Sequence, residues 1–489
     1  MIGLLPDFVD NDKPAIYFHG RCFTYGNVKQ EIHNHQARLT NLFPNFKGKK
    51  IALLLENGPQ LLTLFLAVSA FGGVAVPFDP KWSKNQSTDV WQDCNADYLL
   101  YHASLKEQVE IEGNEKAMEF ESFLKLEHVR VNQAPLDKED LFYIGYTSGT
   151  IGTPKGYMRN HRSWYDCFQY SKELFTLSEK DHILVPGPLV HSHFLYAAVQ
   201  ALHLGATIYL CSRFDASYVW GIIHTAPITV LYQVPTMFEA MYKKRQAEHN
   251  AGNLRIIISS GDKWSFQSKE KAALLFPTTE LYEFYGASEL SFVSLLSPGA
   301  HHRKSQTVGR PFAGVDVKVK HDDGTEAARN EVGKLYVRSP WVFAGYVNRP
   351  SESAEVFDGE WATVGDLAFI DDEGYIHLVG RERNKIISGG LNVYPEQVEV
   401  VIKRMQAIDE VVVIGLDDAY WGEKVVACYT AKFPQNVESM KAHCREHLAT
   451  YQCPKEFIEV EQFPYTSSGK IARGELKNRL SARQQGGIA

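Results

Sequence analysis

TSGTIGTPKG, from Thr147 to Gly156, is the segment that says most about this chain. Glycines let a backbone turn its N–H groups towards one point and approach an anion closely, the hydroxyl side chains add hydrogen bonds, and Lys155 supplies a mobile positive charge. The apolar run from Leu141 to Tyr146 predicts a strand that ends at this loop. We therefore expect a phosphate-binding loop whose ligand is a triphosphate. Its predicted contact residues are Thr147, Ser148, Gly149, Thr150, Gly152, Thr153 and Lys155.

This loop differs from the P-loop of nucleoside triphosphatases. The P-loop requires Gly directly before its Lys and Ser or Thr directly after it, whereas Pro154 and Gly156 flank Lys155. A run rich in glycine and hydroxyl residues is also typical of a flexible turn. The strand ahead and the closing lysine favour phosphate binding, and the type of loop must be identified from other segments.

Composition excludes several classes of protein. The chain has 489 residues, 44% of them hydrophobic, so it can bury a large core and should divide into two or more domains. Its 51 basic and 58 acidic residues give a net charge of -7 without a clustered basic stripe, which argues against a nucleic-acid partner. Seven scattered cysteines without CxxC spacing favour reduced thiols, and we expect a cytoplasmic location.

One segment has the length and apolarity of a membrane span. Leu61 to Phe78 is nearly free of polar groups over 18 residues. Gly72-Gly73 followed by Val74 to Pro77 is better explained as the end of a buried helix and a core strand. We therefore expect no membrane span.

The first 300 residues predict an α/β fold. Lys50 to Leu55 is expected to be a strand, Gly58-Pro59 the start of a helix and Val74 to Pro77 the next strand, which makes a β-α-β unit of parallel sheet. The same alternation returns between Ile228 and Phe284. A large domain of α/β sheets is therefore expected.

Two smaller parts should follow these sheets. Asp316 to Lys320 and Gly333 to Arg338 are expected to pair as a hairpin of a small β subdomain. After Gly380 comes a charged tract, then a helix opening at Pro395 and two strands, which predicts a separate α+β domain. We place the boundary between residues 1–380 and 381–489, with the charged tract as a hinge.

Four further segments follow the phosphate loop in a fixed order. They are Tyr285-Gly286-Ala287-Ser288-Glu289, Val364-Gly365-Asp366-Leu367, Gly380-Arg381 with Gly389-Gly390 beyond it, and Ser467-Ser468-Gly469-Lys470-Ile471-Ala472-Arg473. Together with the loop, this set resembles the adenylate-forming superfamily of acyl-CoA synthetases, luciferases and peptide-synthetase adenylation domains. The resemblance covers essentially the whole chain and is greatest to a short single-chain acyl-CoA synthetase.

The resemblance implies a ligase that works in two steps. A carboxylate attacks the α-phosphate of ATP and releases pyrophosphate, and the thiol of coenzyme A then attacks the acyl-adenylate. Two anions meet in the first step, so cationic and hydrogen-bonding groups must point at the charge on phosphorus. The implied cofactors are ATP, Mg2+ and coenzyme A, and we expect a small to medium apolar acid.

The resemblance also implies roles for single residues. Lys470 is expected to bridge the substrate carboxylate, the α-phosphate and the ribose. Glu289 is expected to hold Mg2+, a task suited to a hard oxygen ligand. Ser288, where the family more often has threonine, would donate to the α-phosphate. The other implied nucleotide contacts are Tyr285 against the adenine, Gly286, Gly261, Asp366 at the ribose hydroxyls, and Arg381.

His191 resembles the histidine that lies between the carboxylate and the thiol channel in acyl-CoA synthetases. Phe194 stands where the family commonly has glycine and is expected to narrow the acyl pocket, and Trp264 is a third candidate for that pocket. His191 and His193 form an HxH pair, but no nearby cysteine or carboxylate completes a metal site.

The thioester-forming step requires the small domain to rotate. The hinge implied by the resemblance is Arg383, where the family usually has Asp or Lys. Gly389 and Gly390 resemble the turn that lines the pantetheine tunnel, because missing side chains leave room. Ile151 replaces a threonine hydroxyl of the phosphate loop, and the lost hydrogen bond would cost roughly 0.5 to 1.5 kcal/mol of binding.

Three other functions stay open. A ligase that loads an acyl or aminoacyl group onto the phosphopantetheine of a carrier protein uses the same first step. A catalytically impaired adenylate-binding protein is a weaker alternative, and an oxygenase of luciferase type has only the fold in its favour. Phe214-Asp215-Ala216-Ser217 copies the segment with which peptide synthetases bind an amino acid's ammonium. We expect Asp215 to cap a helix instead, which disfavours an amino acid substrate.

Overall fold

The computed structural model describes residues 5–110, 115–131, 135–147, 154–246, 252–262, 264–465 and 471–486. The chain forms two compact units. The first contains Met1–Thr147, Pro154–Asp316 and Val337–Ala362, and the second contains Val317–Tyr336 and Thr363–Ala489 together with Ser148–Thr153, which lie outside the described residues.

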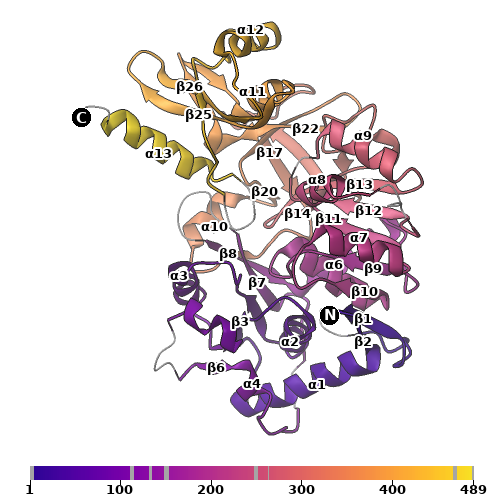
Figure 1. Ribbon diagram of the computed structural model, residues 1–489. Coiled ribbons are helices and arrows are strands. Elements are labelled where there is room, and N and C mark those ends of the chain that lie inside the picture. Colours follow the sequence, from indigo (N-terminus) through magenta and orange to yellow (C-terminus); the bar gives the residue numbers. More distant parts are fainter. Residues whose placement is uncertain are drawn as a thin grey trace. The chain divides into compact units, whose positions relative to one another are not determined.

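A seven-stranded mixed sheet carries the strands that flank the phosphate loop (Figure 1). Its order is β18 (Gly345–Tyr346), β8 (Lys155–Asn160), β7 (Leu141–Thr147), β4 (Val74–Pro77), β3 (Lys50–Leu54), β5 (Tyr98–Tyr101) and β6 (Ala117–Glu119). The strands from β7 to β6 run parallel, and β8 and β18 are antiparallel to their neighbours. The predicted strand ahead of the loop is confirmed as β7.

The predicted β-α-β unit is also confirmed. Helix α2 (Pro59–Ala70) joins β3 to β4, and proline stands at its first turn, where a missing N–H costs nothing. All residues of α2 but Gln60 are buried. The apolar segment that resembled a membrane span is therefore a core helix followed by the core strand β4. No helix in the described part of the chain is both long and apolar enough to span a bilayer.

A second, nine-stranded sheet holds the later α/β alternation (Figure 1). Its order is β15 (Arg310–Pro311), β14 (Ser291–Leu296), β13 (Glu280–Ala287), β12 (Ile256–Ser259), β11 (Val230–Gln233), β9 (His182–Val185), β10 (Thr207–Leu210), β1 (Pro14–Phe18) and β2 (Arg21–Thr24). Strands β9 to β13 and β1 are parallel, so their carboxyl ends share one edge. Ligands of open α/β sheets bind at that edge.

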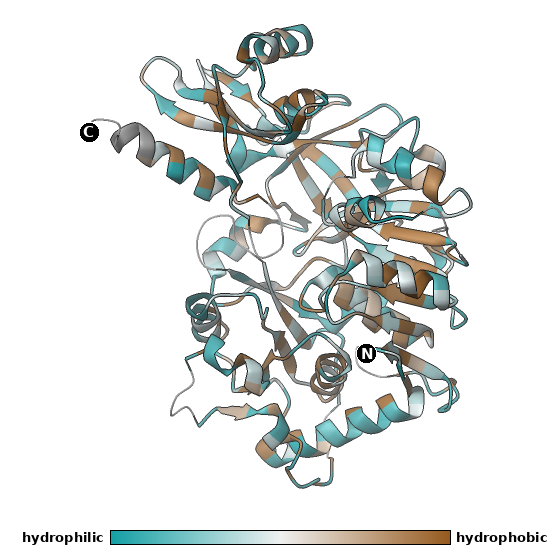
Figure 2. Ribbon diagram, in the orientation of Figure 1, coloured by the Kyte–Doolittle hydropathy of each residue, from teal (hydrophilic) through white to brown (hydrophobic). Residues whose placement is uncertain are grey.

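Helices cover these two sheets. Those of the first unit are α1 (Tyr25–Leu42), α2, α3 (Lys84–Cys94), α4 (Phe120–Phe123), α5 (His161–Leu174), α6 (Ser192–Leu204), α7 (Ala216–Thr225), α8 (Pro235–Lys243), α9 (Phe266–Leu275) and α10 (Pro350–Val356). Figure 2 shows hydrophobic colour along the strands of the nine-stranded sheet and mainly hydrophilic colour along α1. Asp215 caps α7 by accepting from the Tyr218 N–H at 2.8 Å, as expected.

The second unit begins with the predicted β subdomain. Strands β16 (Asp316–Lys320) and β17 (Gly333–Arg338) pair, as expected, and β17 continues to β21 (Asp366–Ile370) and β22 (Ile376–Arg381). The short strands β19 (Phe357–Asp358) and β20 (Trp361–Ala362) belong to the first unit.

The carboxy-terminal part of the second unit is an α+β arrangement. Its sheet has the order β24 (Leu391–Val393), β23 (Ile386–Ser388), β26 (Gly422–Ala431), β25 (Ile408–Asp418), and β27 (Glu456–Glu459) pairs with β26. Its helices are α11 (Pro395–Ile402), α12 (Val437–His447) and α13 (Arg473–Gly486). The predicted fold class is confirmed: sheets with covering helices in a large amino-terminal part, and a smaller α+β domain after it.

The compact units do not divide the chain at the predicted boundary between residues 380 and 381. The β subdomain groups with the carboxy-terminal part, and two charged contacts join these parts. Lys334 Nζ lies 2.7 Å from a Glu382 carboxylate oxygen, and Lys385 Nζ lies 3.6 Å from Asp322. The division at 380/381 describes where the chain would hinge, and it stays a prediction.

Candidate active site

The phosphate loop joins two paired strands. Thr147 ends β7, Lys155 begins β8, and the two residues are register partners. The loop is therefore closed at its base by an antiparallel pair, which brings the lysine within one strand spacing of Thr147. The other predicted loop residues lie outside the described residues: Ser148, Gly149, Thr150, Gly152 and Thr153, with Ile151 among them.

Lys155 contacts two side chains that come from a segment about 200 residues later. Its ammonium forms an ion pair with Glu352 of α10, and it lies 5.5 Å from the ring centroid of Tyr346 on β18. The lysine side chain is 44% exposed. A half-exposed ion pair of this kind contributes little stability, so an anionic ligand can replace Glu352.

Glu289 follows β13 in the nine-stranded sheet and meets the same tyrosine. The Tyr346 hydroxyl donates to Glu289 Oε1 at 2.8 Å, and the Phe343 N–H donates to the Glu289 carbonyl at 2.8 Å. Glu289 is half-buried. The structure thus brings the predicted phosphate-binding lysine and the predicted metal-binding carboxylate to one aromatic ring.

The rest of the YGASE segment lies where β13 ends. Tyr285 and Gly286 are on β13, where the pairing with β14 is irregular between them, and Ser288 begins the turn that follows. Ligands of such sheets lie beyond the carboxyl ends of the strands. All three residues are half-buried at that edge.

Arg159 of β8 supports this turn and was missed by the sequence analysis. Its side chain is 2% exposed, and it donates to the carbonyl oxygens of Ser288 and Trp341. Burial lowers the pKa of the Arg159 guanidinium, while the charges of Tyr157 and Glu289 act in the opposite direction. A buried arginine ties the strand after the phosphate loop to the turn that carries Glu289.

Neighbouring hydroxyls are buried around Arg159. Tyr143 and Tyr157 share a hydrogen bond of 2.9 Å between their hydroxyl oxygens. Burial raises the pKa of Tyr157, and hydrogen bonds with Tyr143, Ser192 and Ser288 partly offset this effect. Ser288 therefore lies within reach of the Tyr157 hydroxyl, beside the start of α6.

His191 and Phe194 lie together at the start of α6. His191 is the N-cap residue, and its carbonyl accepts from the N–H groups of Phe194 and Leu195, each at 3.1 Å. The Phe194 ring packs over Gly187, where a Cβ would lie 2.1 Å from a ring carbon. Phe194 is buried, so it fills space beside His191; whether it limits the acyl pocket stays a prediction. The HxH pair lies on a helix start, and His193 binds the Gln233 carbonyl at 3.0 Å.

Gly261 and Trp264 follow β12 but differ in surroundings. Gly261 has φ +92, within the loop after the carboxyl end of β12. Trp264 is 0% exposed, its indole N–H donates to Ser268 Oγ at 2.7 Å, and its ring packs 5.3 Å from that of Phe238. This packing gives Trp264 a place in the hydrophobic core and argues against the predicted contact with substrate.

In the second unit, Asp366 and Arg381 form an ion pair. They are register partners on β21 and β22, and Arg381 Nε lies 3.0 Å from Asp366 Oδ1. Asp366 is 5% exposed, whereas the arginine side chain is 43% exposed. The two residues predicted to contact the ribose side are therefore brought together by sheet register.

The predicted tunnel turn is a tight hairpin. Gly389 and Gly390 have φ +58 and +79 and join β23 to β24, a geometry that strongly favours glycine in two-residue turns. The Gly389 N–H donates to the Trp421 carbonyl at 2.8 Å. Arg383, the predicted hinge, lies exposed in a short 3-10 helix, Glu382–Asn384.

Lys470 lies outside the described residues, but the residue that anchors its segment does not. Arg473 begins α13, and its guanidinium donates to the Val413 carbonyl and lies 2.7 Å from Glu399. Burial lowers the pKa of Arg473, but the charges of Glu399 and Glu396 outweigh it, and the pKa is raised. The end of the lysine segment is thereby fixed to β25 and α11.

The carboxylates near Lys155 suit a magnesium ion that takes most of its ligands from ATP phosphates and water. Within the described residues, no group of three histidine, cysteine, aspartate or glutamate side chains could enclose a metal. Mg2+ usually keeps several waters and takes one or two carboxylates plus substrate phosphates. Glu289, half-buried and oriented by Tyr346, fits that partial coordination.

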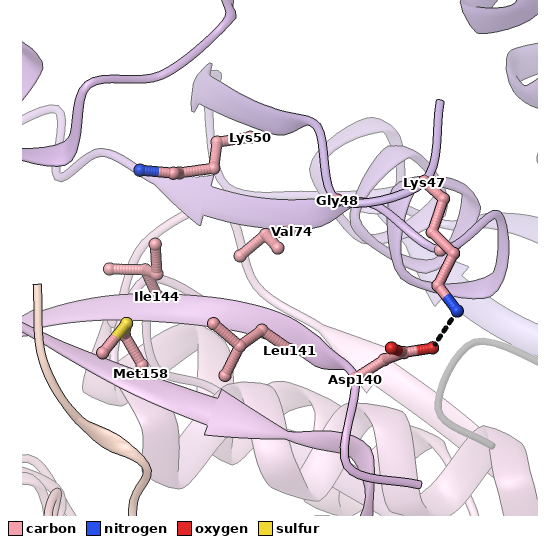
Figure 3. A pocket seen from close by; sticks show the side chains of 9 residues that line it. Lys47, Gly48, Lys50, Val74, Asp140, Leu141, Ile144 and Met158 are labelled. Carbon is pink, nitrogen blue, oxygen red and sulfur yellow. Dashed lines mark ion pairs between the residues drawn. The ribbon is translucent and has the colours of Figure 1, made fainter. Parts of the chain in front are cut away.

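A cavity of about 230 Å3 lies elsewhere in the first unit (Figure 3). Lys50, Val74 and Leu141, the first residues of β3, β4 and β7, line it, and Lys47 forms an ion pair with Asp140 at 2.8 Å across it. The phosphate loop follows the opposite, carboxyl end of β7. The cavity is therefore separate from the candidate active site.

Comparisons with known proteins agree with this arrangement. A model of the AMP-binding enzyme family matches residues 9–347, and a model of the AMP-binding enzyme C-terminal domain matches residues 397–470. The uncharacterized acyl–CoA ligase YhfT of Bacillus subtilis is 37% identical over 437 residues, covering 89% of each chain. The putative long chain fatty acid–CoA ligase VraA of Staphylococcus epidermidis is 31% identical over 472 residues, covering 95% of each.

A solved structure extends the likeness to the fold. The o-succinylbenzoate CoA synthetase MenE of Bacillus subtilis, solved with its acyl-adenylate intermediate, superposes with a TM-score of 0.87 at 26% identity and covers 95% of both chains. The same protein has been solved with ATP and magnesium ion, at the same TM-score and identity. Family models that match most of the chain, ligase relatives and this structure agree, and the chain belongs to the adenylate-forming family of AMP-binding enzymes.

Proposed function

We propose that this protein activates a small to medium, largely apolar carboxylic acid with ATP and transfers the acyl group to coenzyme A. Its family relatives are AMP-forming acyl-CoA ligases, so acid–thiol ligation with ATP, Mg2+ and coenzyme A is the chemistry of the enzyme. The single observation that carries the assignment to this site is geometric. Lys155 and Glu289, from two different sheets, meet at the ring of Tyr346.

The chain's own residues supply the charges that the first step needs. Lys155 would exchange the Glu352 carboxylate for phosphate oxygens of ATP. Glu289 would hold the bound metal, which neutralises phosphate charge when present. Asp366 would accept from the ribose hydroxyls while Arg381 pairs with its other side, and Lys470 would bring the substrate carboxylate to the α-phosphate.

Further residues are proposed for thiol transfer. His191, at the first turn of α6, would lie between the carboxylate and the thiol, with Phe194 filling the space beside it. Arg383 would be the hinge and the Gly389-Gly390 turn would line the pantetheine path. A cytoplasmic location is proposed as well; the seven cysteines are free thiols, consistent with a reducing compartment.

A panel of acids tests this function. Acetate, medium-chain, long-chain and aryl acids are supplied with ATP and magnesium, and pyrophosphate and AMP are measured with and without coenzyme A. We expect pyrophosphate release with a small or medium acid and AMP release that depends on coenzyme A. Pyrophosphate without such dependence would favour loading of a carrier protein, and no pyrophosphate with any acid would favour an impaired adenylate-binding protein.

A lysine variant tests the catalytic assignment. Lys470→Ala should bind ATP normally but make acyl-adenylate at a small fraction of the wild-type rate, because the two anions lose their shared cation. Lys477→Ala, further along α13, is a matched control that should leave the rate unchanged. Adenylate formation by Lys470→Ala at the wild-type rate would contradict the scheme.

A further inference from the structure

Tyr346 lies in the candidate active site but belongs to none of the sequence motifs, and the resemblance to the family gives it no role. It is on the two-residue strand β18, where it pairs with Tyr157 of β8. Lys155 is two residues from Tyr157 on the same strand, so Tyr346 and Lys155 are diagonal neighbours on one face of the sheet. This register explains why the ammonium lies 5.5 Å from the ring centroid.

The tyrosine is itself held firmly. Its N–H donates to Ser353 Oγ at 2.8 Å, and the Ser353 hydroxyl donates in turn to the Arg349 carbonyl at 2.7 Å. The ring of Phe343 packs edge-on against it, with centroids 4.9 Å apart. The same Phe343 donates its N–H to the Glu289 carbonyl. Tyr346 and Glu289 are thus fixed by one short segment.

The hydroxyl contact has a direct consequence for Glu289. A glutamate side chain loses conformational freedom when it is ordered. The hydrogen bond from the Tyr346 hydroxyl to Oε1 orders the Glu289 carboxylate before any ligand arrives. The ring lies beside Lys155, which is paired with Glu352.

We propose that Tyr346 is a positioning residue whose hydroxyl holds the Glu289 carboxylate in place for the metal of the ATP complex. This inference rests on the proposed function in one respect, namely that Glu289 meets Mg2+. The tyrosine does not touch the reacting atoms; it acts through Glu289. A charge-assisted hydrogen bond is strong enough that losing it should weaken metal binding about tenfold.

Tyr346→Phe removes only the hydroxyl and keeps the ring beside Lys155. Binding of Mn2+ in the presence of ATP, without acid or coenzyme A, is measured by electron paramagnetic resonance on the full chain. We expect the apparent Kd for Mn2+ to rise about tenfold, while ATP binding in the presence of EDTA stays unchanged. In pyrophosphate release, a high Mg2+ concentration should restore kcat, because only the metal's occupancy has fallen.

Two further variants separate positioning from general stability. Glu289→Gln should raise the Kd for Mn2+ as well, and adding Tyr346→Phe to it should cause no further rise, because the hydroxyl acts through that carboxylate. Tyr218→Phe on α7, a 39% exposed tyrosine, controls for loss of a phenol hydroxyl and should bind Mn2+ as the wild type does.

An unchanged Kd for Mn2+ in Tyr346→Phe would overturn the inference, whatever its melting temperature. A further loss in the double variant beyond Glu289→Gln would overturn it too. The proposed function can fail separately. Suppose that the wild-type protein binds Mn2+ and ATP, that Tyr346→Phe binds Mn2+ about tenfold more weakly, and that the wild type releases no pyrophosphate with any acid. This result would support the positioning role and refute the ligase assignment. A wild-type protein that binds no Mn2+ with ATP would refute both.

Discussion

Replacing Arg159 by methionine is expected to damage stability and catalysis together. Methionine keeps an unbranched stem of similar length but removes the guanidinium that donates to the Ser288 and Trp341 carbonyls. Because Arg159 is 2% exposed, water cannot easily take over these two contacts. The turn that carries Glu289 would lose its anchor to β8.

The structure sets the size of the effect. Each hydrogen bond from a charged donor contributes about 1.5–3 kcal/mol, so two of them give about 3–6 kcal/mol. Removing the buried charge also removes the free-energy cost of its desolvation, which offsets part of this loss. The lowered pKa of Arg159 indicates that cost. We expect the free energy of unfolding to fall by about 3 kcal/mol, at the low end of that range. Arg159→Lys should lose nearly as much, because an ammonium lacks the planar fork that reaches two acceptors.

Urea unfolding and ATP–pyrophosphate exchange are the two assays. Arg162→Met, three residues along and 45% exposed, is the matched control and should change the unfolding free energy by less than about 1 kcal/mol. Exchange in Arg159→Met should fall at least about tenfold if the Ser288–Glu289 turn shifts by a fraction of an ångström. An unfolding midpoint and an exchange rate equal to those of the wild type would refute the reasoning.

Three other perturbations have defined outcomes. Phe194→Ala should lower the free energy of unfolding by about 3–5 kcal/mol and shift the preferred acid to a longer chain, as a chain-length series of pyrophosphate-release rates would reveal. Ile151→Thr should tighten apparent ATP affinity up to about tenfold by restoring one hydroxyl; an unchanged affinity would mean that the side chain points away. Burial lowers the pKa of His35 from 6.5 to about 3, so the folded state keeps it neutral and stability should fall by about 2 kcal/mol between pH 7.5 and 5. His35→Gln should flatten that pH dependence in urea titrations, whereas replacing the exposed His33 should not.

Local patterns predicted much of the fold. The bounds of β4 and of the paired strands β16 and β17 match the expectation, because the continuous apolar run of β4 and the alternating patterns of the other two end at clear turn residues. The start of α2 at Pro59 followed from proline's fixed backbone.

The parts of the site that the sequence did not predict depend on contacts between residues far apart in the chain. Arg159 meets carbonyls 129 and 182 residues away, and nothing near it in sequence marks it as buried. The Tyr346 hydroxyl meets Glu289 across 57 residues by a contact between two different sheets, which no local period encodes. Trp264 was expected in a pocket because it follows Gly261, but an indole with a satisfied N–H is more stable in the core. The motif residues of the site are close together in the sequence, whereas the residues that hold them in place are far from them in the sequence.

The almost completely buried helix α2 has a consequence for biosynthesis. Phe65 packs against Phe142 and Tyr143 of β7, which leave the ribosome some 70 residues after α2 has been made. At usual elongation rates that interval lasts roughly 4 to 14 seconds. During this interval the nascent chain exposes a hydrophobic helix that has not yet packed against β7. Such a helix can bind a holdase chaperone, and it can promote aggregation when the protein is overproduced.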